Sequence, residues 1–293
     1  MTGTRRTWWW LAAGMAVFGT GVPMAKIVSA YFPVYVGSGI RLVFAVLALL
    51  PFAAIELPRV ETLTRRNWLG LSLAALVGMV GFSVFTLYAL LRLSAIEGVI
   101  VMGTTPIVSS IAMALVARRR PRQAALLAAA LAGLAVLVVA IRGDAVGVAL
   151  MIGAAISATI YTLIADRAQP IIDRISLACI AAFVGAVLLL PLGVFQLIDR
   201  GLASPDLPQW SALVWWGPGV LAIGSVLWHR GVDRSRGHIP PLCLTIPPFS
   251  GMLVALALLG ESLRWHDGVA LALVYLGLIV LIRNDRSLPH RST

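Results

Sequence analysis

Apolar residues run along this chain in long, unbroken stretches that short polar connections separate. A stretch of about 20 such residues crosses the roughly 30 Å hydrocarbon layer of a membrane as one helix. The alternation of apolar and polar residues that membrane strands require is absent. The pattern therefore predicts an all-α integral membrane protein with ten transmembrane helices, at approximately residues 8–27, 34–55, 67–90, 95–116, 123–141, 145–165, 175–196, 210–229, 240–259 and 267–283.

The composition agrees with folding in a bilayer. The 293 residues are 60% hydrophobic and 12% charged, whereas a soluble domain carries about 25% charged residues because its surface faces water. The two cysteines, Cys179 and Cys243, lie far apart in apolar runs. They lack the spacing of a metal site or disulfide framework, and we expect small buried apolar residues there. The sequence therefore predicts no metal and no cofactor.

The basic residues predict the orientation of the chain. With both termini on the same side, 17 of the 23 Lys and Arg residues fall on that side, five fall on the other, and Arg41 lies within the second span. Connections rich in Lys and Arg stay in the cytoplasm, so both termini are predicted to be cytoplasmic. The stretch "ARRRPRQ" at 117–123 resembles a nucleic-acid motif when taken alone. Here it is predicted to be a cytoplasmic hairpin, compatible with anionic-lipid contact, and no nucleic-acid partner is expected.

The chain divides into two similar halves, residues 1–142 and 143–293. Pro106 corresponds to Pro247, and Arg120 corresponds to Glu261, each pair being 141 residues apart. Because each half contains five spans, an odd number, the second half must cross the membrane in the opposite direction. Inverted repeats with a substrate site between them are typical of secondary transporters.

The residues that carry this organisation resemble a known family. They are Lys26, the stretch "FPVYVGSGIR" that leads to Arg41, and "GESLRWHDG" before "YLGLIVLI". Over essentially its whole length the chain resembles the drug/metabolite transporter superfamily, specifically its EamA-domain exporters. Its length and aromatic-rich early spans are most similar to the aromatic amino acid exporters of the YddG type. The resemblance implies a bacterial inner-membrane exporter. Arg120, in the place that Glu261 occupies in the second half, departs from the family pattern.

Paired prolines indicate where a substrate could bind. Pro106 has no N–H to donate to the carbonyl of Met102, and Pro247 and Pro248 likewise release two carbonyls one turn earlier. Such breaks are tolerated in a membrane where protein or a water-filled cavity satisfies the released groups. Because the breaks are paired, we expect them to lie at the substrate cavity and to take part in gating. The alternative is that these prolines only shape helix packing.

Helical spacing then predicts which side chains face a central cavity between spans 1, 3, 4, 6, 8 and 9. Arg41 is the foremost candidate, since a cation within a span demands a partner or water. The alternatives are a structural ion pair or snorkelling for Arg41, backbone or helix–helix hydrogen bonds for the hydroxyl groups, and lipid-facing or interfacial packing for the aromatic rings. The remaining candidates are Phe82, Ser83, Phe85, Tyr88, Met102, Thr105, Ser109, Ser157, Tyr161, Ser225, Trp228, His229 and Thr245.

Acidic residues are absent from the middle of the predicted spans, which disfavours a dedicated cation exporter. Enzyme motifs such as HExxH, G-x-S-x-G and the P-loop are absent as well. We therefore expect a secondary transporter that exports small amphipathic metabolites, amino acids and especially aromatic ones, by alternating access. We expect the protein to be a monomer in the lipid bilayer. The alternatives are an exporter of cationic drugs and, from another class, a membrane-embedded enzyme or lipid-handling protein.

Overall fold

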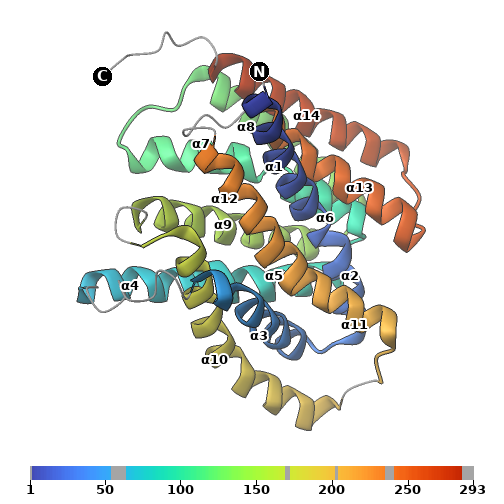
Figure 1. Cartoon of the computed structure of the whole chain (residues 1–293). Coiled ribbons are helices and arrows are strands. Elements are labelled where there is room, and N and C mark those ends of the chain that lie inside the picture. Colours follow the sequence, from blue (N-terminus) through green and yellow to red (C-terminus); the bar gives the residue numbers. More distant parts are fainter. Residues whose placement is uncertain (1, 54–63, 169–171, 202–203, 235–240, 286–293) are drawn as a thin grey trace.

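The computed structural model describes residues 2–53, 64–168, 172–201, 204–234 and 241–285, and all regular secondary structure in these ranges is helical (Figure 1). Nine helical segments of the described chain are long and apolar enough to cross a membrane, and a tenth, Cys243–Leu259, is apolar but shorter. They match the ten predicted spans to within a few residues. Residues 54–55 and 240 of the second and ninth predicted spans lie outside the described ranges. The predicted helical membrane fold is confirmed.

Spans one, three and four of the first half are interrupted. Span one consists of α1 (Thr2–Gly19) and α2 (Gly21–Tyr31), and span two is α3 (Val34–Ala53). Span three contains α4 (Arg65–Leu73), the π-helical η2 (Ala74–Gly81) and α5 (Phe82–Leu90). Span four contains α6 (Ala95–Met102) and α7 (Thr105–Val116), and span five is α8 (Gln123–Arg142).

In the second half, spans eight and nine are interrupted. Spans six and seven are the continuous helices α9 (Ala145–Ala168) and α10 (Arg174–Arg200). Span eight contains α11 (Leu207–Val214), the π-helical η3 (Trp215–Ile223) and α12 (Gly224–Arg234). Span nine contains η4 (Pro241–Thr245) and α13 (Ile246–Leu259), and span ten is α14 (Trp265–Asp285). With ten spans both chain ends lie on one side, and we call the opposite side the outer side.

The packing of the spans follows an approximate two-fold relation between the halves. The most extensive contacts join α3 with α10 and α8 with α14, which are spans two with seven and five with ten (Figure 1). Span one packs along span eight through α1 and α12, and span six packs along span three through α9, α5 and η2. Reciprocal pairing of this kind is what a two-fold axis between similar units produces.

Small residues allow these close pairings. The face of α8 that is buried carries Ala125, Ala128, Ala132 and Ala135, whereas its leucines are largely exposed and directed away from the protein. In a bilayer apolar side chains gain little from leaving lipid, so small residues at the contact, which let backbones approach, determine which helices pair. The exposed leucines of α8 are therefore the lipid-facing surface.

Candidate functional site

Spans four and nine are broken at corresponding positions. Thr104 and Thr245 are 141 residues apart, and each precedes the second helical segment of its span. Their backbone angles φ and ψ are nearly identical, at −79° and −13° for Thr104 and −86° and −12° for Thr245. A proline follows two residues later in both spans, and its nitrogen cannot donate to the preceding turn. The helices thus break where the paired prolines predict.

Local hydroxyl groups satisfy carbonyls at these breaks. Thr105 Oγ1 donates to the Met102 carbonyl at 2.7 Å, which is the carbonyl that Pro106 leaves without a backbone donor. Tyr275 Oη donates to the Thr245 carbonyl at 3.1 Å. In this conformation the Thr105 hydroxyl, predicted to face substrate, completes the broken helix instead.

A third break, in span one, is missing from the sequence prediction. Thr20 separates α1 from α2, and Pro23 has no N–H for the Gly19 carbonyl. A Cβ atom on Gly251 would lie only 2.6 Å from that carbonyl oxygen, so α13 crosses α1 at the break. A Cβ atom on Gly103 would likewise lie 3.0 Å from Pro248 Cγ. The breaks of spans one, four and nine therefore meet. The sequence "GTGVP" at 19–23 is the signal that indicates the first of them.

The two π-helical segments, η2 and η3, also occupy corresponding positions. Their first residues, Ala74 and Trp215, are 141 residues apart. Pro218 interrupts the hydrogen bonding of η3, and π-helical turns frequently occur at functional sites. Trp215 Nε1 donates to Thr20 Oγ1 at 2.8 Å, which connects η3 to the break of span one. The irregular segment of span eight is thus in direct contact with the break of span one.

Arg41 of α3 contacts both η3 of span eight and α5 of span three. Its side chain is buried, with the guanidinium carbon 4.2 Å above the Trp216 ring and 5.5 Å from the Phe82 ring. Nη1 donates to Ser83 Oγ, and Nε donates to the Trp216 carbonyl at 3.4 Å. A Cβ atom on Gly217 would lie 2.7 Å from the Arg41 carbonyl oxygen, so η3 crosses α3 at close range. The sequence missed Trp216, whose position next to Arg41 depends on this crossing.

The charge of Arg41 has no carboxylate partner within the described part of the chain. Its contacts there are the Ser83 hydroxyl, the Trp216 carbonyl and two aromatic rings. Aromatic faces attract a cation, more strongly when it is desolvated, but they do not neutralise its charge. Within the described ranges no group of three His, Cys, Asp or Glu side chains could hold a metal ion. The arrangement can accept a negatively charged group.

The other predicted residues fall into separate contacts. Tyr161 and Ser157 of α9 pack on Gly78 and Gly81 of span three, where added Cβ atoms would lie 2.6 Å from Tyr161 Cβ and 3.2 Å from Ser157 Oγ. Ser109 Oγ is hydrogen-bonded to Thr159 Oγ1 at 3.0 Å, which joins α7 to α9.

The remaining candidates lie on α12, α5 and α6. On α12, His229 Nδ1 lies 2.7 Å from the Ser225 carbonyl, and the backbone of Trp228 packs against Gly14 of α1. Phe85 is 39% exposed and its ring lies over Gly153. Met102 packs against the main core cluster. The structure therefore brings Arg41, Phe82 and Ser83 together and distributes the other candidates over helix contacts.

On the outer side, polar side chains from both halves hold helix ends together. The Glu261 carboxylate accepts hydrogen bonds from the backbone N–H groups of Ala95, at 2.7 Å, and Ile96, at 2.9 Å. These are N–H groups of the first turn of α6, where a helix favours negative charge. Lys26 Nζ donates to the Leu90 and Leu93 carbonyls at 2.6 and 2.8 Å, at the end of α5. Glu261 thus links the second half to the first.

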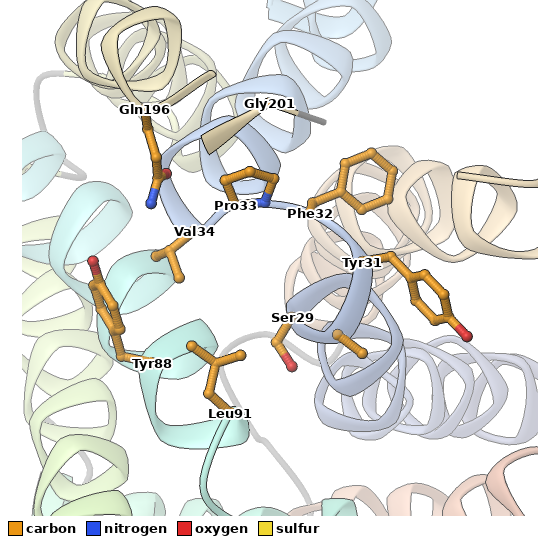
Figure 2. A pocket seen from close by; sticks show the side chains of 10 residues that line it. Ser29, Tyr31, Phe32, Pro33, Val34, Tyr88, Leu91, Gln196 and Gly201 are labelled. Atoms are coloured by element: carbon orange, nitrogen blue, oxygen red, sulfur yellow. The ribbon is translucent and has the colours of Figure 1, made fainter. Parts of the chain in front are cut away.

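A pocket of about 250 Å³ opens on the same side, between the ends of α2, α5 and α10 (Figure 2). Gln196 Oε1 accepts the Tyr35 N–H at 2.8 Å, which fixes the orientation of its amide. Tyr88 is the one predicted site residue in its wall, and its ring packs edge-on against Tyr35 at 6.2 Å between centroids. The lining residues are Ser29, Ala30, Tyr31, Phe32, Pro33, Val34, Tyr88, Leu91, Gln196 and Gly201.

Comparison with known proteins identifies the family. The model of the EamA-like transporter family matches residues 6–141 and matches again over residues 145–283. The chain belongs to the EamA-like transporter family. This multi-pass membrane protein therefore contains two EamA repeats, and the family indicates a transporter and not an enzyme.

Individual relatives support this assignment. The chain is 24% identical over 281 residues to the uncharacterized transporter YetK of Bacillus subtilis (strain 168), covering 93% of this chain and 85% of that protein. A solved crystal structure of a protein that is 17% identical superposes with a TM-score of 0.65, covering 98% of this chain and 99% of the other. At this identity the second match shows the shared fold.

Proposed function

We propose that this transporter exports small amphipathic metabolites, with amino acids, especially aromatic ones, as the substrate class. The observation that carries the proposal is Arg41, a buried cation between the Trp216 and Phe82 rings, next to broken spans. A carboxylate complements the guanidinium in charge and geometry, and apolar bulk suits the neighbouring rings. Carbonyl groups at helix breaks suit an ammonium group, as in other transporters with discontinuous spans.

Transport by alternating access is supported by the position of the breaks. Spans one, four and nine contact one another at their breaks, since Cβ atoms on Gly19 and Gly103 would lie 2.8 Å from Pro247 Cα and 3.0 Å from Pro248 Cγ. A broken span can bend at its break, since the backbone there already lacks the continuous hydrogen bonding of a helix. The two halves could then separate on one side and close on the other around a site near the midplane.

Export of cationic drugs, the alternative within transporters, is disfavoured by the same residue. A substrate cation near Arg41 would meet an unneutralised positive charge away from water, where screening is weak. The distribution of basic residues supports an inner membrane location with both chain ends in the cytoplasm, so that export runs toward the outer side.

A flux experiment tests the proposal. Purified protein in liposomes loaded with unlabelled amino acid is expected to take up labelled phenylalanine or tryptophan by counterflow, and to leave ethidium outside. Arg41→Gln is expected to lower this exchange at least tenfold, since one hydrogen bond to a charged group contributes about 1.5–3 kcal/mol.

Arg120→Gln is the matched control, because it removes an exposed arginine of the hairpin between α7 and α8 and should leave exchange unchanged. Thermal unfolding of each purified variant shows whether it is folded. Movement of ethidium without exchange of any amino acid would reject the proposal in favour of the cationic-drug alternative.

A further inference from the structure

The pocket at the outer ends of α2, α5 and α10 has buried side chains in its walls and exposed ones beside them (Figure 2). Phe32, Val34 and Gln196 are buried, whereas Tyr31 and Leu91 are exposed. Its volume of about 250 Å³ lies just below the roughly 300–1,000 Å³ of sites for drug-sized molecules. The pocket therefore has room for a small molecule with one ring.

One donor in the wall of this pocket has no partner in the described chain. Gln196 is 7% exposed, and its Oε1 accepts the Tyr35 N–H at 2.8 Å. Because only the oxygen of an amide can accept that bond, the orientation of the amide is fixed. Nε2 is then directed toward the space between Val34 and Tyr88 (Figure 2), and within the described residues it donates to no acceptor. A buried donor without an acceptor costs free energy, so the amide indicates an acceptor group from outside the chain.

Acceptors at the end of α2, which lines the pocket, have no backbone donor. In a continuing helix the carbonyls of Ser29 and Tyr31 would accept the N–H groups of residues 33 and 35. Residue 33 is a proline without an N–H, and the N–H of residue 35 goes to Gln196. Within the described chain these carbonyls therefore form the uncapped, partially negative end of a helix. Such an end favours a cation.

The neighbouring helix α5 shows how this chain satisfies an end of the same kind. Lys26 places its ammonium group on the Leu90 and Leu93 carbonyls, at 2.6 and 2.8 Å. Helix α2 ends on the same side of the membrane, but no Lys or Arg side chain of the described residues donates to its last carbonyls. An ammonium group of the chain thus caps α5, whereas the end of α2 is left to a ligand or to water.

We propose that this pocket is an outer binding site for a zwitterionic amino acid with an aromatic or apolar side chain. The ammonium group binds the last carbonyls of α2, as the Lys26 ammonium binds those of α5. The carboxylate accepts hydrogen bonds from Gln196 Nε2, and the side chain packs against Tyr88 and Leu91. This inference rests on the proposed function and extends it, because it gives the exported amino acid a second site on the side where it is released.

Thiol protection measures occupancy of this pocket separately from occupancy of the Arg41 site. In a protein that carries Cys179→Ala, Cys243→Ala and Leu91→Cys, phenylalanine is expected to slow labelling by a membrane-impermeant maleimide. Phenylacetate lacks the ammonium group and phenethylamine lacks the carboxylate. Each should therefore need about tenfold more ligand than phenylalanine for half protection, since each forfeits a hydrogen bond to a charged group.

Gln196→Glu tests the carboxylate end of the site. Glutamate can still accept the Tyr35 N–H, but it presents a second oxygen where the amide nitrogen stood. At about pH 8, where glutamate is ionised, half protection by phenylalanine should need about tenfold more ligand. Phenethylamine should instead protect at a lower concentration, because the new charge attracts its ammonium group. Thermal unfolding shows whether the variant is folded, and the comparison of the three ligands on the protein with Gln196 stands without it.

Two matched controls separate occupancy from conformational change. Leu263 is another exposed leucine of the outer side, in the connection between α13 and α14. Leu263→Cys in place of Leu91→Cys should therefore be labelled equally fast with and without phenylalanine. Arg41→Gln changes the central site and should leave the protection of Leu91→Cys unchanged.

Several outcomes would overturn the outer site. Equal protection by phenylalanine, phenylacetate and phenethylamine would mean that apolar contact alone drives binding. Protection of Leu263→Cys as well, or loss of protection in Arg41→Gln, would mean that labelling reports a movement driven from the central site. Amino acid exchange without protection of Leu91→Cys would reject the outer site and leave the proposed function standing. Protection without exchange would reject the proposed function and leave the outer site standing.

Discussion

The hydrogen bonds of Glu261 predict a measurable preference for a closed outer side. Glu261 belongs to the connection between α13 and α14, and its carboxylate binds the first turn of α6 in the other half. Opening the outer side by separating the halves would break both bonds. Glu261→Gln keeps the size of the side chain but removes its charge and one of the two acceptor oxygens.

The magnitude follows from the two contacts. A hydrogen bond to a charged group contributes about 1.5–3 kcal/mol, and the partial exposure of Glu261 favours the lower end. The two bonds together therefore contribute about 3 kcal/mol, whereas the single neutral bond that glutamine can retain contributes about 1 kcal/mol. The expected loss is about 2 kcal/mol, which shifts the equilibrium toward the outward-open state roughly 30-fold.

Thiol labelling measures this shift. Met24, 7% exposed, lies in the core cluster with Ala95 and Ile96, so a cysteine there should react only when the outer side opens. In a protein that carries Cys179→Ala, Cys243→Ala and Met24→Cys, adding Glu261→Gln should raise the labelling rate by a membrane-impermeant maleimide roughly 30-fold.

Glu97→Gln is the matched control. Glu97 Oε2 accepts the Ser94 N–H at 2.8 Å within the same half, as part of the capping box of α6. Glutamine can keep this capping hydrogen bond, so Glu97→Gln removes a charge next to α6 but should leave the labelling rate unchanged. An unchanged rate in Glu261→Gln, or an equal rise in both variants, would refute the idea that Glu261 holds the halves together.

Two further predictions concern packing and pH. Gly251→Ala should destabilise the protein by about 1–3 kcal/mol in thermal unfolding, because its Cβ would meet the Gly19 carbonyl at 2.6 Å. Gly133 has open space around it, so Gly133→Ala should not destabilise the protein. Equal melting temperatures for the two variants would contradict the close crossing of α13 and α1. Two hydrogen bonds lower the pKa of the Asp144 carboxyl, the larger effect coming from the backbone N–H of Gly147 and the smaller from Arg92. Its contribution to stability is then present above the ordinary aspartate pKa of about 3.9 and lost as pH falls through the lowered value. The melting temperature of Asp144→Asn should fall less than that of the wild type as the pH is lowered through this range. If the two proteins show the same dependence of melting temperature on pH, the effect is excluded.

Local sequence predicts some of the helix breaks and not others. Pro106 and Pro247 remove a backbone donor wherever they stand, so the breaks of spans four and nine were predictable from the sequence. The break at Thr20 has a weaker signal, since Pro23 lies three residues beyond it within glycine-rich sequence. Segment η2 contains no proline at all, and nothing in its composition distinguishes it from an ordinary apolar helix.

Local sequence predicts Arg41 as a site residue but does not predict its neighbours. Arg41 was identified because a charge within an apolar span is costly wherever the span lies. Trp216 is 175 residues further along the chain, and it reaches Arg41 only because Gly217 lets η3 cross α3 closely.

The sequence by itself determined the ten spans, their predicted orientation and the two related halves, since the transfer of a residue between water and lipid depends mainly on that residue and its near neighbours. The tertiary structure decided which faces of the helices meet, and with them the neighbours of Arg41 and the contact between Glu261 and α6. Those contacts depend on the rotation of each helix about its axis. Close packing of small residues across the whole bundle sets that rotation, and no single stretch of the chain contains it.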